Sequence, residues 1–408
     1  MKVVLSLFSG CGGMDLGFEG AFPVFSGCVN TAFHPDWIEK KLSKSLVLLK
    51  KTSFQTVFAN DINKKAKLAW TGYFSKFGHP GSIYRTESIV DVIKNNAPLP
   101  KNVAVVTGGF PCQDFSVAGK RLGLNSHKSH EGVVGGALTS MENRGNLYLW
   151  MKKTVELVKP KVFVAENVKG LVSLGDAYRT IVSDFKSSDG YLIVKPRILQ
   201  AAEYGVPQSR ERVFFIGFLK KALTEEAAKA LQAENTPPEF DPYPPRTHFI
   251  HREERIRRDD LAPAVTCGEV LLDLPEPEDA ADESQRRYSK ARFLDNSSQG
   301  QIEIKLDGVS PTIRSEHHGN IEYRRLSKKH KGANEAERKL KERRLTVREC
   351  ARIQTFPDDY QFIFKNGKES LSASEAYKLI GNAVPPLLAY AIARRLERNW
   401  HLYFGDPE

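Results

Sequence analysis

Cysteine is scarce in this sequence and is not arranged as disulfide or zinc proteins need it. The chain has five cysteines among 408 residues, an odd number without Cys-x-x-Cys spacing. Disulfide frameworks and zinc modules use pairs or clusters, so the pattern argues against both and favours a reducing compartment. The five are Cys11, Cys28, Cys112, Cys267 and Cys350.

Long apolar runs and internal repeats are also missing. No stretch reaches the roughly 18 uncharged apolar residues of a membrane span, so we expect no membrane partner. The first eleven residues resemble the start of an export signal, but the apolar core at 3–8 is shorter than the usual ~7–15 residues. We interpret it as the first strand of a cytoplasmic enzyme.

Basic residues are in excess, with 60 Lys and Arg against 49 Asp and Glu, a net charge of +11. That balance favours a polyanionic partner such as nucleic acid. The length exceeds what one core comfortably holds, which predicts one large and one smaller domain.

Apolar runs of strand length alternate with amphipathic runs of helix length from residue 1 to about 219. This alternation predicts an α/β fold, a mostly parallel sheet with helices on both faces. The expected strands are residues 3–8, 56–59, 103–106, 162–165, 192–199 and 212–218.

The pattern changes after residue 219. Residues 220–235 look helical, five prolines between 237 and 245 exclude regular structure, and a polar, basic region follows up to 344. Regular patterning then returns. Thr346 and Glu349 form a capping box for a helix at 347–356, and a last helix is expected at 386–398.

The economical division is one α/β domain, residues 1–219 with 345–408, interrupted by an inserted domain at 220–344. Residues 21–54 form a further insertion, within which we expect a helix at 37–49.

Cys112 follows the strand at 103–106 after two glycines, a phenylalanine and a proline. A thiol at the carboxyl end of a central strand lies where α/β enzymes place reactive groups. A helix beginning just after it would favour the nucleophilic thiolate. The alternative is a free cysteine that fills a buried gap.

The first strand runs into a turn with glycines at 10, 12 and 13, which lets the backbone approach a ligand closely. The turn is neither a P-loop nor a full Gly-x-Gly-x-x-Gly, so a triphosphate site is unsupported, whereas a carboxylate would suit the following helix. Asp61 ends the next strand, where an acid accepts hydrogen bonds from a ribose diol. A helix cap is the equal alternative for Asp61.

Two further segments supply charged groups. Glu166 follows the strand at 162–165, where partial desolvation would raise its pKa and let it donate a proton. Gln208, Arg210 and Arg212 are spaced to share one strand face, an arrangement that suits a phosphate or a base carbonyl. Arginines on the rim of a sheet are also common without any such role.

In chain order, the segments read Phe-Ser-Gly-Cys-Gly-Gly, Gly-Phe-Pro-Cys-Gln-x-Phe-Ser, Glu-Asn-Val, Gln-x-Arg-x-Arg and Gly-Asn-Ala-Val-Pro-Pro. This ordered set resembles the DNA (cytosine-5)-methyltransferase family, especially its free-standing bacterial and phage enzymes. The resemblance covers nearly the whole chain except 21–54 and 220–344. It implies a Rossmann-like, class I S-adenosylmethionine-dependent methyltransferase sheet, with a target-recognition domain at 220–344.

The resemblance implies methyl transfer to C5 of a cytosine flipped out of a short specific sequence in double-stranded DNA. Cys112 would attack C6, because sulfur addition makes C5 nucleophilic. Glu166 would hold N3 and the exocyclic amine, and Arg212 the base carbonyl, with Arg210 in the same catalytic set. Residues assigned to DNA contact are Gln113, Ser116, Lys120, Arg121 and Arg314.

The implied cofactor is S-adenosylmethionine, with S-adenosylhomocysteine as product. Asp61 and Ile62 would lie at its ribose and adenine, although Ser88 stands where relatives usually carry an aspartate near the adenine. The other cofactor positions implied are Phe8, Gly10, Gly12, Gly13, Ile89, Leu147 and Asn382.

The resemblance further implies a cytoplasmic monomer in a restriction-modification system, paired with a restriction endonuclease. Alternatives are an orphan regulatory DNA methyltransferase, a transfer RNA cytosine-5 methyltransferase and a silent DNA-binding module. The transfer RNA enzymes tend to carry Cys-Phe-Thr in the recognition region, where this chain has Thr-Cys267-Gly. A nicotinamide-dependent dehydrogenase would explain only the first βαβ unit.

Overall fold

The computed structural model describes residues 1–111, 147–188, 190–251, 260–294, 299–315, 320–366 and 369–406. Its strands are β1 Lys2–Leu7, β2 Pro23–Phe25, β3 Ile38–Lys41, β4 Leu46–Leu49, β5 Phe54–Asn60, β6 Tyr84–Arg85, β7 Val103–Gly109, β8 Val162–Val168, β9 Tyr191–Ile193, β10 Arg197–Gln200, β11 Glu211–Leu219, β12 His248–Phe249, β13 Ala262–Pro263, β14 Tyr323–Arg325, β15 Arg343–Arg344, β16 Phe364–Asn366 and β17 Glu369–Leu371. Its α-helices are α1 Gly13–Glu19, α2 Lys64–Phe74, α3 Ile89–Lys94, α4 Leu147–Val158, α5 Gly175–Lys186, α6 Glu225–Gln232, α8 Cys267–Leu271, α9 Glu283–Arg286, α10 Val347–Ile353, α11 Ala373–Asn382, α12 Pro386–Arg398 and α13 Trp400–Phe404.

The central sheet has eight strands in the order β10-β11-β8-β7-β1-β5-β6, with β9 also paired to β11. Strands β8, β7, β1, β5 and β6 run parallel, and β11 runs antiparallel to its neighbours. The predicted mostly parallel α/β sheet is therefore confirmed, with an antiparallel edge.

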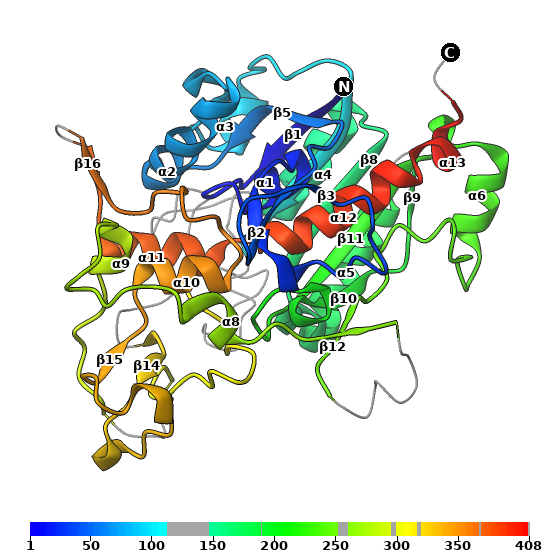
Figure 1. Ribbon diagram of the computed structural model, residues 1–408. Helices are drawn as coiled ribbons and strands as arrows, with labels where there is room; N and C mark the ends of the chain where they lie inside the picture. The colour runs from blue at the N-terminus through cyan, green and yellow to red at the C-terminus, as the bar shows by residue number, and fades with distance from the viewer. Residues whose placement is uncertain are drawn as a thin grey trace.

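Alternating strand residues feed two separate cores, one on each face of the sheet. In β11, Phe214 and Ile216 pack with α1, α2 and α12, whereas Val213 and Phe215 pack with α3, α4 and α5. Helices thus cover both faces, and Figure 1 shows α1 and α12 side by side in front of the sheet. These central strands read as apolar runs because both faces are buried.

The insertion at 21–54 is a small antiparallel sheet in the order β2-β4-β3, so the helix expected at 37–49 is wrong. The leucines at 42, 46 and 49 imitate helical spacing. The chain instead turns at Ser43, whose hydroxyl accepts hydrogen bonds from the amides of Ser45 and Leu46. Val47 and Leu49 are then buried by two-residue alternation.

The single strand expected at 192–199 is also wrong, because Pro196 lies inside it and has no N–H for the ladder. Strand β9 pairs with the end of β11, and β10 pairs with its beginning.

Other expected elements are found. Helix α6 lies within the predicted 220–235, the prolines that follow lie in irregular chain, and α12 has the predicted bounds. Helix α10 has the capping box of Thr346 and Glu349, but it ends at Ile353 rather than 356. Thr355 there has a φ of 66°, which helical backbone does not allow.

The region from 246 to 344 has few regular elements. Its strands β14 and β15 pair at the lower left of Figure 1, and α10 and α11 lie between them and the sheet. Buried ion pairs join this region to α10. The Arg343 guanidinium donates both ways to the Glu349 carboxylate, at 2.9 Å each.

Candidate active site

The candidate site lies along the carboxyl edge of the parallel strands. Register pairs Leu7 of β1 with Gly108 of β7, and Gly109 with Glu166 of β8, so these strands end together. Because β11 is antiparallel, its beginning lies at this same edge and places Arg212 opposite Val168. The topology therefore collects groups from four distant segments.

Glu166 and Arg212 form a buried ion pair at this edge. The Arg212 Nε lies 2.9 Å from Glu166 Oε1. Burial raises the pKa of Glu166 above its ordinary value, although the charges of Arg212 and Arg210 oppose the rise. A raised pKa is the direction that a proton donor needs.

Two residues that sequence reasoning did not single out support this pair. A Cβ at Gly109 would lie 2.9 Å from Glu166 Oε2, so the second glycine before the proline leaves space for the carboxylate. Asn167 Nδ2 donates to the Phe110 carbonyl at 3.2 Å and so fixes the chain just before Cys112. Both belong to motifs already noted, but their partners could not be read from one sequence.

Cys112 itself, with Gln113, Ser116, Lys120 and Arg121, lies outside the described residues. The other four cysteines are free and buried. Burial raises the pKa of Cys28 and of Cys267 to about 12, and it raises the pKa values of Cys11 and Cys350 as well. These four thiols are poor candidates for a nucleophile, because the thiolate is the reactive form.

The glycine turn after β1 is held open toward the same edge. Gly10 has a φ of 53°, its amide donates to Asp61 Oδ2 at 3.0 Å, and a Cβ there would meet no atom within 4 Å. A Cβ at Gly12 would lie 2.6 Å from the Trp70 ring, and one at Gly13 would lie 2.3 Å from the Val384 carbonyl oxygen. Gly12 and Gly13 are thus needed for packing behind the turn, and Gly10 faces free space.

Asp61 follows β5 and is not a helix cap. Asn63 caps α2, by accepting from the amides of Lys65 and Ala66, whereas Asp61 Oδ1 accepts from the Asn63 amide at 2.9 Å. A carboxylate has about four acceptor positions, so it can accept from a ligand as well. Ile62 beside it is 44% exposed, which puts an apolar surface next to an acid.

The remaining cofactor positions lie at the start of the turn and in three helices, α3, α4 and α11. Phe8 has a φ of 52° at the start of the turn, and Ile89 and Leu147 are buried at the first turns of α3 and α4. Asn382 is exposed at the end of α11, in the segment that meets Gly13. Ser88 caps α3 by accepting from the Val90 amide at 3.3 Å.

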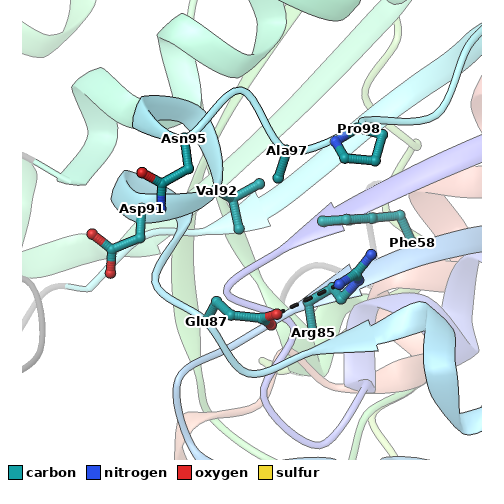
Figure 2. A pocket seen from close by; sticks show the side chains of 8 residues that line it. All are labelled: Phe58, Arg85, Glu87, Asp91, Val92, Asn95, Ala97 and Pro98. Carbon is teal, nitrogen blue, oxygen red and sulfur yellow. Dashed lines mark hydrogen bonds and ion pairs between the residues drawn. The ribbon is translucent and has the colours of Figure 1, made fainter.

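A cavity of about 140 Å³ is lined by residues of β5, β6 and α3 and of the chain around α3, and by none of the glycine turn. Figure 2 shows it between the end of β6 and α3, with Phe58 on one wall and the Arg85–Glu87 ion pair at 3.5 Å. None of the predicted cofactor positions lines it. Within the described ranges, no group of three acidic, His or Cys side chains could hold a metal, and no helix could cross a membrane.

Arg210 is not placed as a base contact, which corrects its assignment to the catalytic set. It is fully buried, and its guanidinium donates to the main-chain carbonyls of Ile313, Gly381 and Ala383. The two-residue alternation from 208 to 212 fails as an argument, because β11 begins only at Glu211.

Arg314 likewise lies in the junction between regions rather than on an open surface. Its backbone passes directly against Gly381, and its Nη1 is buried with no hydrogen-bond partner among the described residues. Burial raises the pKa of Glu322 to about 7, although the Arg314 charge opposes the rise. The assignment of Arg314 to DNA contact stays a prediction.

Residues 2–398 match the family described as C-5 cytosine-specific DNA methylase. The chain belongs to this family. It is 32% identical to the Type II methyltransferase M.BsuRI of Bacillus subtilis, over 98% of this chain and 80% of that protein. It is also 32% identical to M.BspRI of Lysinibacillus sphaericus, over 99% of this chain and 83% of the relative.

Solved structures share the fold of this methyltransferase. The Entamoeba histolytica methyltransferase EhMeth aligns with a TM-score of 0.56 and 15% identity, over 98% of this chain and 99% of the other. The S. pombe Dnmt2 methyltransferase aligns with a TM-score of 0.51 and 18% identity, over 98% and 99%. The predicted family, the Rossmann-like fold and the enzyme class, a DNA (cytosine-5)-methyltransferase, are thereby confirmed.

Proposed function

We propose that this enzyme methylates C5 of a flipped-out cytosine in a short specific sequence of double-stranded DNA, through a covalent bond to Cys112. The observation that carries the proposal is the buried Glu166–Arg212 pair beside Phe110. Extrusion of the base costs a few kcal/mol of stacking and pairing, which contacts in the pocket offset.

Cys112, Glu166 and Arg212 each have one role in the proposed reaction. The Cys112 thiolate attacks C6, and the electron density added to the ring makes C5 nucleophilic. Glu166, in its neutral form, donates a proton at N3 as that charge develops, and Arg212 holds the base carbonyl. After C5 is methylated, water takes the C5 proton, the electrons of that C–H bond restore the double bond as the Cys112 thiolate leaves, and N3 returns its proton to Glu166.

The residues at the glycine turn fit S-adenosylmethionine. Asp61 can accept from a ribose diol, the exposed Ile62 suits an adenine face, and the open space at Gly10 admits a ligand close to the backbone. When bound, this group supplies an electrophilic methyl and leaves as S-adenosylhomocysteine. The chain's part is to orient it toward the edge that carries Glu166.

The region at 220–344 would select the DNA sequence, and the enzyme would act as a cytoplasmic monomer. The curated relatives are Type II methyltransferases, which supports a restriction-modification system with a paired endonuclease. Bisulfite sequencing of a plasmid carrying the gene would identify the modified sequence.

A mechanism-based trap tests the adduct. Duplexes that carry 5-fluorocytosine at the modified position retain fluorine at C5, so elimination cannot occur and the protein stays attached. We expect a denaturation-resistant complex whose cross-linked peptide contains residue 112, and none with Cys112→Ser.

Cys28→Ala is the matched control, because that thiol is buried away from the edge and should still cross-link. Recovery of a different residue, or methylation by Cys112→Ser at a near-normal rate, would refute the assignment. Methyl transfer to RNA in place of the duplex would support the transfer RNA alternative.

A further inference from the structure

Three segments that are far apart in sequence meet at one buried polar cluster, which we call the junction. Its side chains are Gln208, Arg210 and Gln354, and all three are fully buried. They connect the chain before β11, the segment 310–315 of the recognition region, and residues 380–384, which are the end of α11 and the turn after it.

Arg210 bridges two of these segments through main-chain carbonyls. Its Nη1 donates to the Ile313 carbonyl at 2.9 Å. Its Nη2 donates to the carbonyls of Gly381 and Ala383, at 2.7 and 2.9 Å. A planar guanidinium can hold three carbonyls at fixed angles, which an ammonium cannot.

The two glutamines complete the junction. Gln208 Oε1 accepts from the Ile313 amide at 3.0 Å, and its Nε2 donates to Gln354 Oε1 at 2.9 Å. Gln354 Nε2 donates in turn to the Ile380 carbonyl at 2.7 Å. Ile313 is therefore held by both its N–H and its C=O, from two neighbouring side chains.

The segments also touch without side chains between them. A Cβ at Gly381 would lie 2.3 Å from the carbonyl carbon and oxygen of Arg314, so only glycine allows this approach. On the other side, Ser209 donates its amide to the Ser310 carbonyl, and Thr312 Oγ1 donates to the Ser209 carbonyl at 2.6 Å. The recognition segment thus lies between β11 and the turn.

Two of the three segments at the junction continue into different parts of the candidate site. Two residues beyond Arg210, Arg212 pairs with Glu166. One residue from Gly381 lies Asn382, and Val384 packs against Gly13 of the glycine turn. A shift of the segment 310–315 must move both the chain before β11 and residues 380–384. If it moved alone, the hydrogen bonds of the junction would break and leave buried polar groups unpaired.

We propose that the junction couples DNA binding to cofactor binding, with Arg210 as the positioning residue. DNA held by the recognition region and cofactor held at the glycine turn favour the same arrangement of the three segments. Each ligand therefore increases affinity for the other by one common factor, because coupling between sites is reciprocal. This inference rests on the proposed function.

The test measures that factor directly. Affinity for S-adenosylhomocysteine is determined by calorimetry alone and with a saturating duplex that carries the modified sequence. For the unaltered enzyme we expect the duplex to tighten binding by roughly 5- to 150-fold, the usual range for coupled sites. In Arg210→Lys we expect affinity without DNA to stay within about twofold and the factor to fall toward one.

Arg395→Lys is the matched control. Its guanidinium also donates to main-chain carbonyls, those of Asp241 and Pro238, but away from the junction. In Arg395→Lys the duplex should increase the affinity for S-adenosylhomocysteine as much as it does in the unaltered enzyme. Gln354→Leu and Gly381→Ala perturb the junction by other means and should lower the factor like Arg210→Lys, so the test does not depend on one variant folding.

An unchanged factor in Arg210→Lys and Gln354→Leu would overturn the proposal, as would an equal loss in Arg395→Lys. Neither result would touch the proposed function, which the fluorocytosine trap tests on the unaltered enzyme. If no cross-linked complex with 5-fluorocytosine DNA forms but the coupling factor is intact, the covalent mechanism is wrong and the role of the junction is still supported.

Discussion

At the residue scale, Glu166 combines two opposing demands. Desolvation favours its neutral form, whereas the Arg212 guanidinium 2.9 Å away favours the charged one, and desolvation is the larger effect. A carboxyl in this balance can give up a proton as charge develops on a bound ring. The same balance destabilises the folded protein when the carboxyl is ionised.

Glu166→Gln should therefore separate activity from stability. We expect methyl transfer to fall by about 10²- to 10⁴-fold, the usual loss when a general acid is removed. We expect the free energy of unfolding at pH 8 to rise, because the raised pKa means that ionisation penalises the native state.

The stability gain should shrink as pH falls through the native pKa, since both proteins then carry a neutral group. Urea unfolding at several pH values measures it. A gain that is independent of pH, or one that grows in acid, would contradict this account of Glu166.

At the element scale, α10 is tied by buried ion pairs to the region 246–344. Glu349 lies at its first turn, where it accepts from the Thr346 amide and pairs with the Arg343 guanidinium. Desolvation acts to raise the pKa of Glu349, but the charge and hydrogen bonds of Arg343, with the charge of Arg324, together lower it to about 2. The helix thus begins at a buried ion pair instead of a solvated cap.

Glu349→Gln should cost up to about 3–5 kcal/mol at pH 7, because it breaks the buried pair with Arg343 and leaves that guanidinium to the partly exposed Glu276 carboxylate. A depressed pKa gives stability that is present above the ordinary carboxyl pKa and is lost as pH falls toward 2. The difference from the unaltered protein should therefore narrow between pH 6 and pH 3.

Glu375→Gln is the control for that experiment. It removes the same capping-box acid from α11, but Glu375 is half-buried and pairs only with the solvated Lys65 at 3.6 Å among the described residues, so we expect a loss below about 1 kcal/mol. Equal losses in the two variants, measured by urea unfolding, would show that the cap and not the ion pair matters.

Elements with strong local signals could be predicted, and those set by distant partners could not. The capping box of Thr346 and the bounds of α12 depend on neighbours within one turn. The strands at 38–41 and 46–49 depend on pairing within a small sheet, so their leucine spacing misled. The assignment of Arg210 to the catalytic set was wrong for the same reason, because the carbonyls that its guanidinium binds lie more than 100 residues away in sequence.

At the scale of the whole molecule, the surplus of positive charge is distributed unevenly. The segment 326–342 is held by Glu303, whose carboxylate accepts from the amides of Leu326, Ala333 and Asn334. Its lysines at 328, 329 and 331 are exposed. The fold thus holds a rigid loop that presents cations to solvent, which suits contact with DNA phosphates.

Replacing those three lysines by glutamine should weaken DNA binding at low salt without changing the modified sequence. The slope of log affinity against log salt should become less steep by about 0.9 for each phosphate that the variant no longer neutralises. Filter binding over a salt series measures it, and the control replaces the exposed hairpin lysines Lys40, Lys41 and Lys44. The same slope in the parent and the 328–331 variant would exclude this loop from the interface.

The close approach of Gly13 to the Val384 carbonyl also bears on how the protein is made. Translation runs from the N-terminus, and early segments usually begin to fold while later ones are still being synthesised. Here the glycine turn at residues 10–13 cannot pack against Val384 until residue 384 has been synthesised and has left the ribosome. The glycine turn therefore reaches its final packing only after residue 384 has been synthesised, so its assembly is a late event in folding.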